Sequence, residues 1–115
     1  MDTLPKHSMK TLDLNGLRIN IYAEKLDNAL FILISKQGLK LGTLIFSMRE
    51  VGEPSRSTTL LGWRGEVQAR IFAEKVSSET GLMTLLSINL EEEHVQKHFR
   101  SILEALNQCI KEVSI

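Results

Sequence analysis

Cysteine is nearly absent from the chain, with Cys109 alone among 115 residues, so no disulfide can form within it. This scarcity fits a reducing compartment, and we expect the cytoplasm, with the nucleus as a further location. Cys109 lies in a helical pattern without a His or a cation in register beside it. We therefore expect a small buried filler and not a reactive thiol.

A net charge is missing as well, because 14 Lys and Arg residues balance 14 Asp and Glu residues. Without it, no overall field draws the chain to nucleic acid or to an anionic membrane. The longest apolar run, Ala29–Ile34, is too short to cross a bilayer, and the N-terminal stretch lacks the apolar core of a secretory signal. We expect neither nucleic acid nor a membrane as a partner.

Groups arranged for catalysis are also lacking. His94 and His98 are one helical turn apart, but Glu does not follow the first His and no third ligand stands at a suitable spacing. Gly38 and Gly42 lie between strand patterns, so we expect a turn residue and a point of close approach instead of a phosphate loop. The sequence therefore predicts no enzyme, no metal site and no cofactor.

The pattern that is present predicts a single α+β domain over residues 10–115, preceded by a flexible segment over residues 1–9. We expect an antiparallel sheet of about five to six strands with two helices on one face and the other face used for dimerisation. The expected strands cover residues 12–14, 17–21, 29–36, 39–48, 58–61 and 82–88. The expected helices cover residues 66–79 and about 92–113.

Local signals support several of these elements. Asn15-Gly16 between alternating segments predicts a hairpin at one edge of the sheet. In the first helix Ala69, Phe72, Ala73 and Val76 form the apolar stripe, Val67 and Ile71 widen it, and Gly81 ends the helix. In the second helix Asn89 and Glu92 suggest a reciprocal cap before one continuous stripe. That stripe consists of Val95, Phe99, Ile102, Leu103, Leu106, Ile110 and Val113.

The stretch Ala29–Met48 is apolar on both faces, and Gln37-Gly38 near its middle predicts a central hairpin. A half-solvated antiparallel hairpin alternates apolar and polar residues, so this one must be covered on both sides. The helices cover one side, and we predict that another protein chain covers the other. The candidate interface residues are Phe31, Ile32, Leu44, Ile45 and Phe46, with either the Ile32/Ile45 face or the Phe31/Phe46 face in contact.

The segment Arg49–Ser57 contains Gly, Pro and four charged residues, which predicts an exposed, mobile loop. We expect Arg49, Glu50, Glu53 and Arg56 to contact a binding partner. Trp63, between two glycines, is the aromatic residue expected to be partly exposed. It serves either as an interface anchor or as a lid over the sheet edge.

Four short strings resemble the proteasome assembly chaperones of the third and fourth kinds: Asn28–Ile34, Lys40–Leu44, Ser57–Gly62 and Ile88–Leu90. The likeness covers roughly Leu17 to Val113 and includes the order of elements. It implies a non-catalytic protein that pairs with a like chain, holds proteasome α-type subunits while the α-ring of the 20S particle is built, and then leaves. The end Val113-Ser114-Ile115 lacks the Tyr of the hydrophobic–Tyr–any tail found in two other branches.

Several alternatives remain open at this point. The string Leu41–Leu44 favours the third kind and the string Ser57–Gly62 favours the fourth, so both a homodimer and a heterodimer remain possible. The competing class is a dimeric scaffold of the roadblock or longin type, which organises signalling or trafficking complexes. Those folds usually place a helix between early strands, whereas this sequence predicts four strands first.

Overall fold

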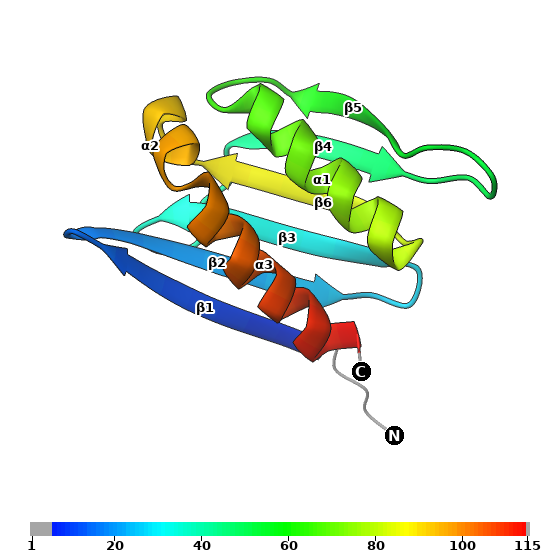
Figure 1. Cartoon of the computed structure of the whole chain (residues 1–115), viewed down its shortest axis with the longest axis horizontal. Coiled ribbons are helices and arrows are strands. Elements are labelled where there is room, and N and C mark those ends of the chain that lie inside the picture. The colour runs from blue at the N-terminus through cyan, green and yellow to red at the C-terminus, as the bar shows by residue number, and fades with distance from the viewer. Residues whose placement is uncertain (1–5, 115) are drawn as a thin grey trace.

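A six-stranded mixed sheet carries three helices, and in Figure 1 α1 and α3 lie across the same face of it. The computed structural model describes residues 6–114. The strands are β1 (Lys6–Leu14), β2 (Leu17–Lys25), β3 (Ala29–Lys36), β4 (Thr43–Met48), β5 (Arg56–Leu61) and β6 (Met83–Asn89). The helices are α1 (Glu66–Thr80), α2 (Glu92–Lys97) and α3 (Phe99–Ser114). The predicted α+β class is confirmed, and the sheet order is β1-β2-β3-β6-β4-β5.

The first hairpin forms where its sequence predicts it, at the sheet edge. Asn15 and Gly16 both have positive φ, at 57° and 86°, as a tight two-residue turn requires. Asp13 lies opposite Arg18 in the antiparallel register, as expected. The edge strand is longer than predicted, because β1 already begins at Lys6. Lys6–Met9 therefore belong to the sheet, and the rest of the expected flexible segment lies outside the described residues.

The predicted central hairpin is wrong. The strand β6 lies between β3 and β4, pairing in parallel with β3 and antiparallel with β4. Ile32 is therefore opposite Leu86, and so is Ile45 from the other side. The sheet is mixed and not antiparallel. The strands β3 and β4 are interior strands of the sheet, and β6 lies between them.

The connection between β3 and β4 crosses the end of β6 at Gly42, which was predicted as a point of close approach. A Cβ at Gly42 would lie 2.2 Å from the carbonyl oxygen of Ile88. The Gly42 N–H donates to Ser87 Oγ at 2.8 Å, and Asn89 Nδ2 donates to the Leu41 carbonyl at 2.8 Å. These contacts fix the crossover against β6.

The helix α1 matches its predicted span within one residue and ends at Gly81, whose N–H donates to the Ser77 carbonyl. It packs on β4, β5 and β6, whereas α3 packs on β1 and β2. Its predicted core residues Ala69, Phe72, Ala73 and Val76 are buried. Two of the predicted core residues are not, because Val67 and Ile71 are 63% and 48% exposed. They lie on the outer side of the helix, away from the sheet.

The second predicted helix is divided at His98 into α2 and α3. The predicted Asn89 cap is also wrong: Glu91 precedes the helix in an extended conformation, and the Asn89 side chain bonds to Leu41 instead. In α3 the stripe is buried or half-buried as predicted, and Cys109 is a fully buried filler. Phe72 and Phe99 stack at 4.6 Å between ring centroids and join α1 to α3.

Candidate interaction surface

The two faces of the sheet have different surroundings. On the face beneath the helices Ile32, Ile45 and Leu86 are fully buried in the core. Ile32 and Ile45, two of the predicted interface residues, are therefore excluded from any contact surface of this fold. Of the two faces proposed from the sequence, only the one that carries Phe31 and Phe46 is available.

The opposite face carries an apolar surface without a helix over it among residues 6–114. Phe31, Leu85 and Phe46 lie in one row across β3, β6 and β4, as their pairing partners show. The next row contains Leu33, Ser87 and Leu44, with Leu61 opposite Leu44 on β5. We call the seven residues Phe31, Leu33, Leu44, Phe46, Met48, Leu61 and Leu85 the open apolar face. Each keeps part of its side chain accessible to water.

The open face becomes polar over β1 and β2. The Thr11 hydroxyl donates to Asn20 Oδ1 at 2.8 Å. The His7 and Tyr22 rings stack with 6.1 Å between their centroids. The Tyr22 hydroxyl donates to Glu24 Oε1 at 2.5 Å. This hydrogen bond raises the pKa of Tyr22 to about 12, with smaller contributions from burial and from the charge of Glu24. This half of the face satisfies its own polar groups, so the part that needs a cover is over β3, β6, β4 and β5.

Titration of Tyr22, the single tyrosine of the chain, tests this arrangement directly. We expect the folded protein to ionise Tyr22 with a pKa of about 12, and the unfolded chain near the ordinary value of about 10. Because the folded pKa is raised, the stabilisation is complete below about pH 10 and is lost as pH rises through the folded pKa. Ultraviolet absorbance of phenolate measures both values. The Glu24→Gln variant should shift the folded pKa downward, and an unchanged pKa would contradict the role of this bond.

The predicted partner-binding loop is exposed, but several contacts hold it. Arg49 donates from Nη1 to the Ser78 carbonyl at 2.8 Å, at the end of α1, and from Nε to the Glu53 carbonyl at 3.3 Å. Arg56 Nη2 lies 3.2 Å from Glu53 Oε2. Arg56 and Ser57 already belong to β5. Among the four charged residues predicted to bind a partner, Glu50 differs from the others. Its carboxylate makes no hydrogen bond or ion pair with residues 6–114.

Trp63 lies in the connection from β5 to α1 and is 53% exposed, which confirms the predicted partial exposure. The Arg64 guanidinium stands 4.1 Å from the centroid of its ring. A cation over an indole face is favourable by roughly 0.5–1 kcal/mol at an exposed site. Arg64 also lies 3.8 Å from Glu91 Oε1, so its charge is shared between the indole face and a carboxylate.

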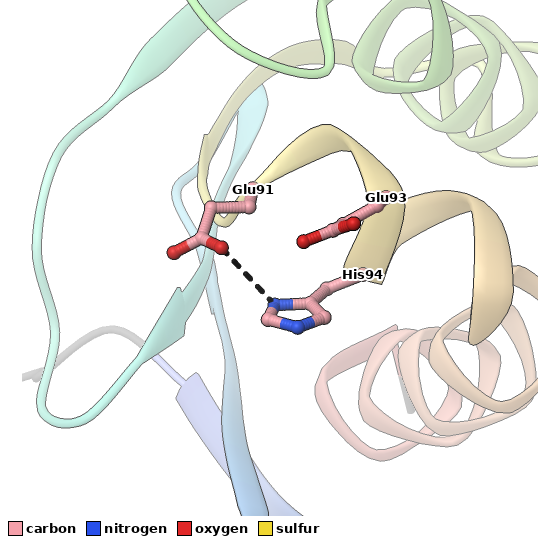
Figure 2. Close-up of side chains that lie close together, drawn as sticks. All are labelled: Glu91, Glu93 and His94. Carbon is pink, nitrogen blue, oxygen red and sulfur yellow. Dashed lines mark ion pairs between the residues drawn. The ribbon is translucent and has the colours of Figure 1, made fainter.

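A cluster that the sequence did not predict lies at the start of α2. Glu91, Glu93 and His94 bring potential ligand atoms within 4.8 Å of one another, and Figure 2 shows His94 Nδ1 facing Glu91 at 3.9 Å. Glu91 is already paired with Lys36 at 3.2 Å and with Arg64 at 3.8 Å. The hydrogen bond from Lys36 is the main reason that the pKa of Glu91 is lowered. These cations compete with any metal ion.

The spacing of His94 and His98 predicted no metal site, and the two histidines do not belong to one cluster of potential ligands among residues 6–114. His98 ends α2, whereas Glu91, Glu93 and His94 come from the cap and the first turn of that helix. The spacing of three residues between Glu91 and His94 is the local signal that could have indicated the cluster. No helix among the described residues is long and apolar enough to span a membrane.

Comparison with known proteins identifies a solved structure of similar fold. No family model matches the chain, and no curated protein matches it. A solved chain from a structure described as a novel chaperone complex for yeast 20S proteasome assembly superposes with a TM-score of 0.76. The match covers 96% of this chain and 99% of that one, at 12% sequence identity. This likeness shows that the two chains share a fold.

Proposed function

We propose that this protein is a non-catalytic assembly chaperone of the proteasome assembly chaperone family. Paired with a like chain, it holds proteasome α-type subunits during assembly of the α-ring of the 20S particle and then dissociates. The observation that carries the proposal is the open apolar face on a fold shared with a chaperone complex for proteasome assembly. In a dimer, the like chain would cover this face.

We propose that the two partners use different surfaces. The partner chain contacts Phe31, Leu44 and Phe46, which lie on the face opposite the helices. The α-type subunit contacts the loop containing Arg49, Glu50, Glu53 and Arg56 at one end of β5, and Trp63 at the other end of β5 is a second candidate contact. Charged groups on a loop speed association more than they tighten binding. A chaperone that must leave the finished particle benefits from contacts of this kind.

An assembly chaperone must bind the intermediate more tightly than the product. A ligand with equal affinity for two states does not shift the equilibrium between them. We therefore expect the protein and its partner to co-migrate with free α subunits and with partial α-rings, and to be scarce on mature particles. The measurement is size exclusion followed by native gels, probed for this chain and for α subunits. Removing Ser114 and Ile115 should leave this migration unchanged, because neither residue is a Tyr. Val113 itself is retained because it is buried.

Two outcomes would contradict the proposal. Stoichiometric migration with the mature particle would mean that the protein is a stable subunit and not a chaperone. Absence from every fraction that contains α subunits would favour the dimeric scaffold class. In that case the proteins captured with the chain would identify the complex that it organises.

A further inference from the structure

A hollow of about 280 Å³ opens beside the β4–β5 hairpin, at one end of the open apolar face. Its apolar part is formed by Phe46, Met48 and Pro54, and its charged part by Glu50, Glu53 and Arg56. The apolar side chains come from β4 and the loop, and the acids come from the loop alone. A hydrophobic wall next to charged groups is the environment suited to a long side chain with an apolar stem and a charged end.

The net charge of the residues that line the hollow indicates whether the charged end of such a side chain is a cation or an anion. Glu53 is paired with Arg56 at 3.2 Å, whereas no described residue from 6 to 114 pairs with the carboxylate of Glu50. The groups that line the hollow itself are two carboxylates and one guanidinium, a net charge of −1, whereas Arg49 of the same loop bonds to the carbonyls of Glu53 and Ser78. The Glu53–Arg56 pair is itself weak, because the Arg56 side chain is 80% exposed. The hollow is complementary to a cation.

The loop that forms the hollow is already shaped. The Glu53 N–H donates to the Glu50 carbonyl at 3.0 Å, closing a turn in which Gly52 has φ of 80°. Arg49 fastens this turn to the end of α1 through the Ser78 carbonyl. A site held in its binding shape loses little conformational freedom when a ligand enters, so binding is weakened less by ordering.

We propose that this hollow binds an arginine or lysine side chain presented by a partner protein. The aliphatic stem packs on Met48 and Pro54, and the cationic head pairs with Glu50. This inference rests on the proposed function, since it gives a chemistry to the contact made by the loop at residues 49–56. It specifies that the partner presents an exposed basic residue there. An acidic or purely apolar segment would leave the charge of Glu50 uncompensated.

The test uses the full chain labelled with ¹⁵N and two blocked amino acids of nearly equal shape, N-acetyl-arginine amide and N-acetyl-citrulline amide. Amide shifts are followed at Met48, Glu53 and Thr58, which line the hollow. We expect saturable shifts there, with citrulline bound about two- to fivefold more weakly, the range of an exposed ion pair. The Glu50→Gln variant should reduce arginine binding to the level of citrulline. The Glu104→Gln variant, which removes an exposed acid on α3, should bind arginine as the unaltered chain does.

Several results would overturn the inference: equal binding of both probes, unchanged arginine binding by Glu50→Gln, saturable shifts confined to another surface, or none at the hollow. Because the titration contains no proteasome subunit, its failure leaves the co-migration experiment to decide the proposed function. Conversely, selective arginine binding by a chain that misses every α-containing fraction would keep the hollow and reject the α-subunit assignment.

Discussion

Replacing Phe46 by Asp is expected to convert the paired protein into a monomer that keeps its fold. Phe46 lies on the open apolar face opposite Leu85 and is half-buried there, so an Asp in the single chain still reaches water. In a dimer that stacks on this face, the charge would be buried without compensation. Truncating a central anchor of an interface costs about 2 kcal/mol or more, roughly a thirtyfold loss of affinity, and the charge adds to it. Light scattering at micromolar concentration, alone and with the like chain, measures the loss.

The matched control places the same charge on the other side of the molecule. Val67 on the outer side of α1 is 63% exposed, so Val67→Asp removes apolar surface without touching the open apolar face. We expect this variant to pair normally. Dissociation by Val67→Asp with normal pairing of Phe46→Asp would move the interface to the helix layer. Circular dichroism of both variants verifies that the fold is retained.

Replacing Gly42 by Ala is expected to produce the largest loss of stability of any single methyl addition in the β3–β4 connection. The added carbon would lie 2.2 Å from the Ile88 carbonyl oxygen and 2.9 Å from Asn89 Cα, both backbone atoms that cannot rotate away. The connection must then move off β6, weakening the bond from Gly42 to Ser87. We expect the free energy of unfolding to fall by about 2–4 kcal/mol, as for severe overpacking. Urea unfolding followed by circular dichroism measures it.

Gly38 in the same connection gives the control. It has φ of 75° but nothing within 4 Å of an added Cβ, so Gly38→Ala strains the backbone without a collision. A residue with a Cβ in this conformation costs about 1–2 kcal/mol. Equal losses for the two variants would show that the close approach at Gly42 is not what holds the crossover.

The sequence predicted most of the elements because each one carries its own local signal. Asn15-Gly16 specifies a tight turn, Gly81 ends α1, and apolar periodicity marks both long helices. The spans of β6 and α1 followed from the same kind of pattern. Val67 and Ile71 were wrongly predicted to be buried. Their helical spacing extends the apolar stripe in the sequence, but only the packing in the fold decides which side of that stripe is covered.

The strand order was not predictable in this way. A turn signal at Gln37-Gly38 says that the chain bends, but not whether another strand will later enter the gap. The two-sided apolar pattern of β3 and β4 was consistent with a central hairpin and with two strands separated by a third. Gly42 was identified as a point of close approach, but no local pattern indicated that β6 is the element approached.

The candidate site was predicted in the same partial way. Phe31, Leu44 and Phe46 could be grouped from alternation, but which face met the helices was left open, and Ile32 and Ile45 proved to be core residues. The Glu91, Glu93 and His94 cluster is local, because its residues lie within one turn at the start of α2, so the spacing of Glu91 and His94 could have indicated it. The hollow at Glu50 depends on how the loop folds against β4, which no periodic pattern records.

The central position of β6 also sets the order of events during synthesis. The first five strands leave the ribosome before β6 does, and until β6 arrives β3 and β4 each have one unpaired edge. Pairing β6 with both requires contacts between residues far apart in the chain, which slows folding. A nascent chain stalled before Met83 would therefore expose two bare interior edges, the kind of surface that other strands join. Premature termination in this protein is thus expected to release aggregating fragments and not a smaller folded domain.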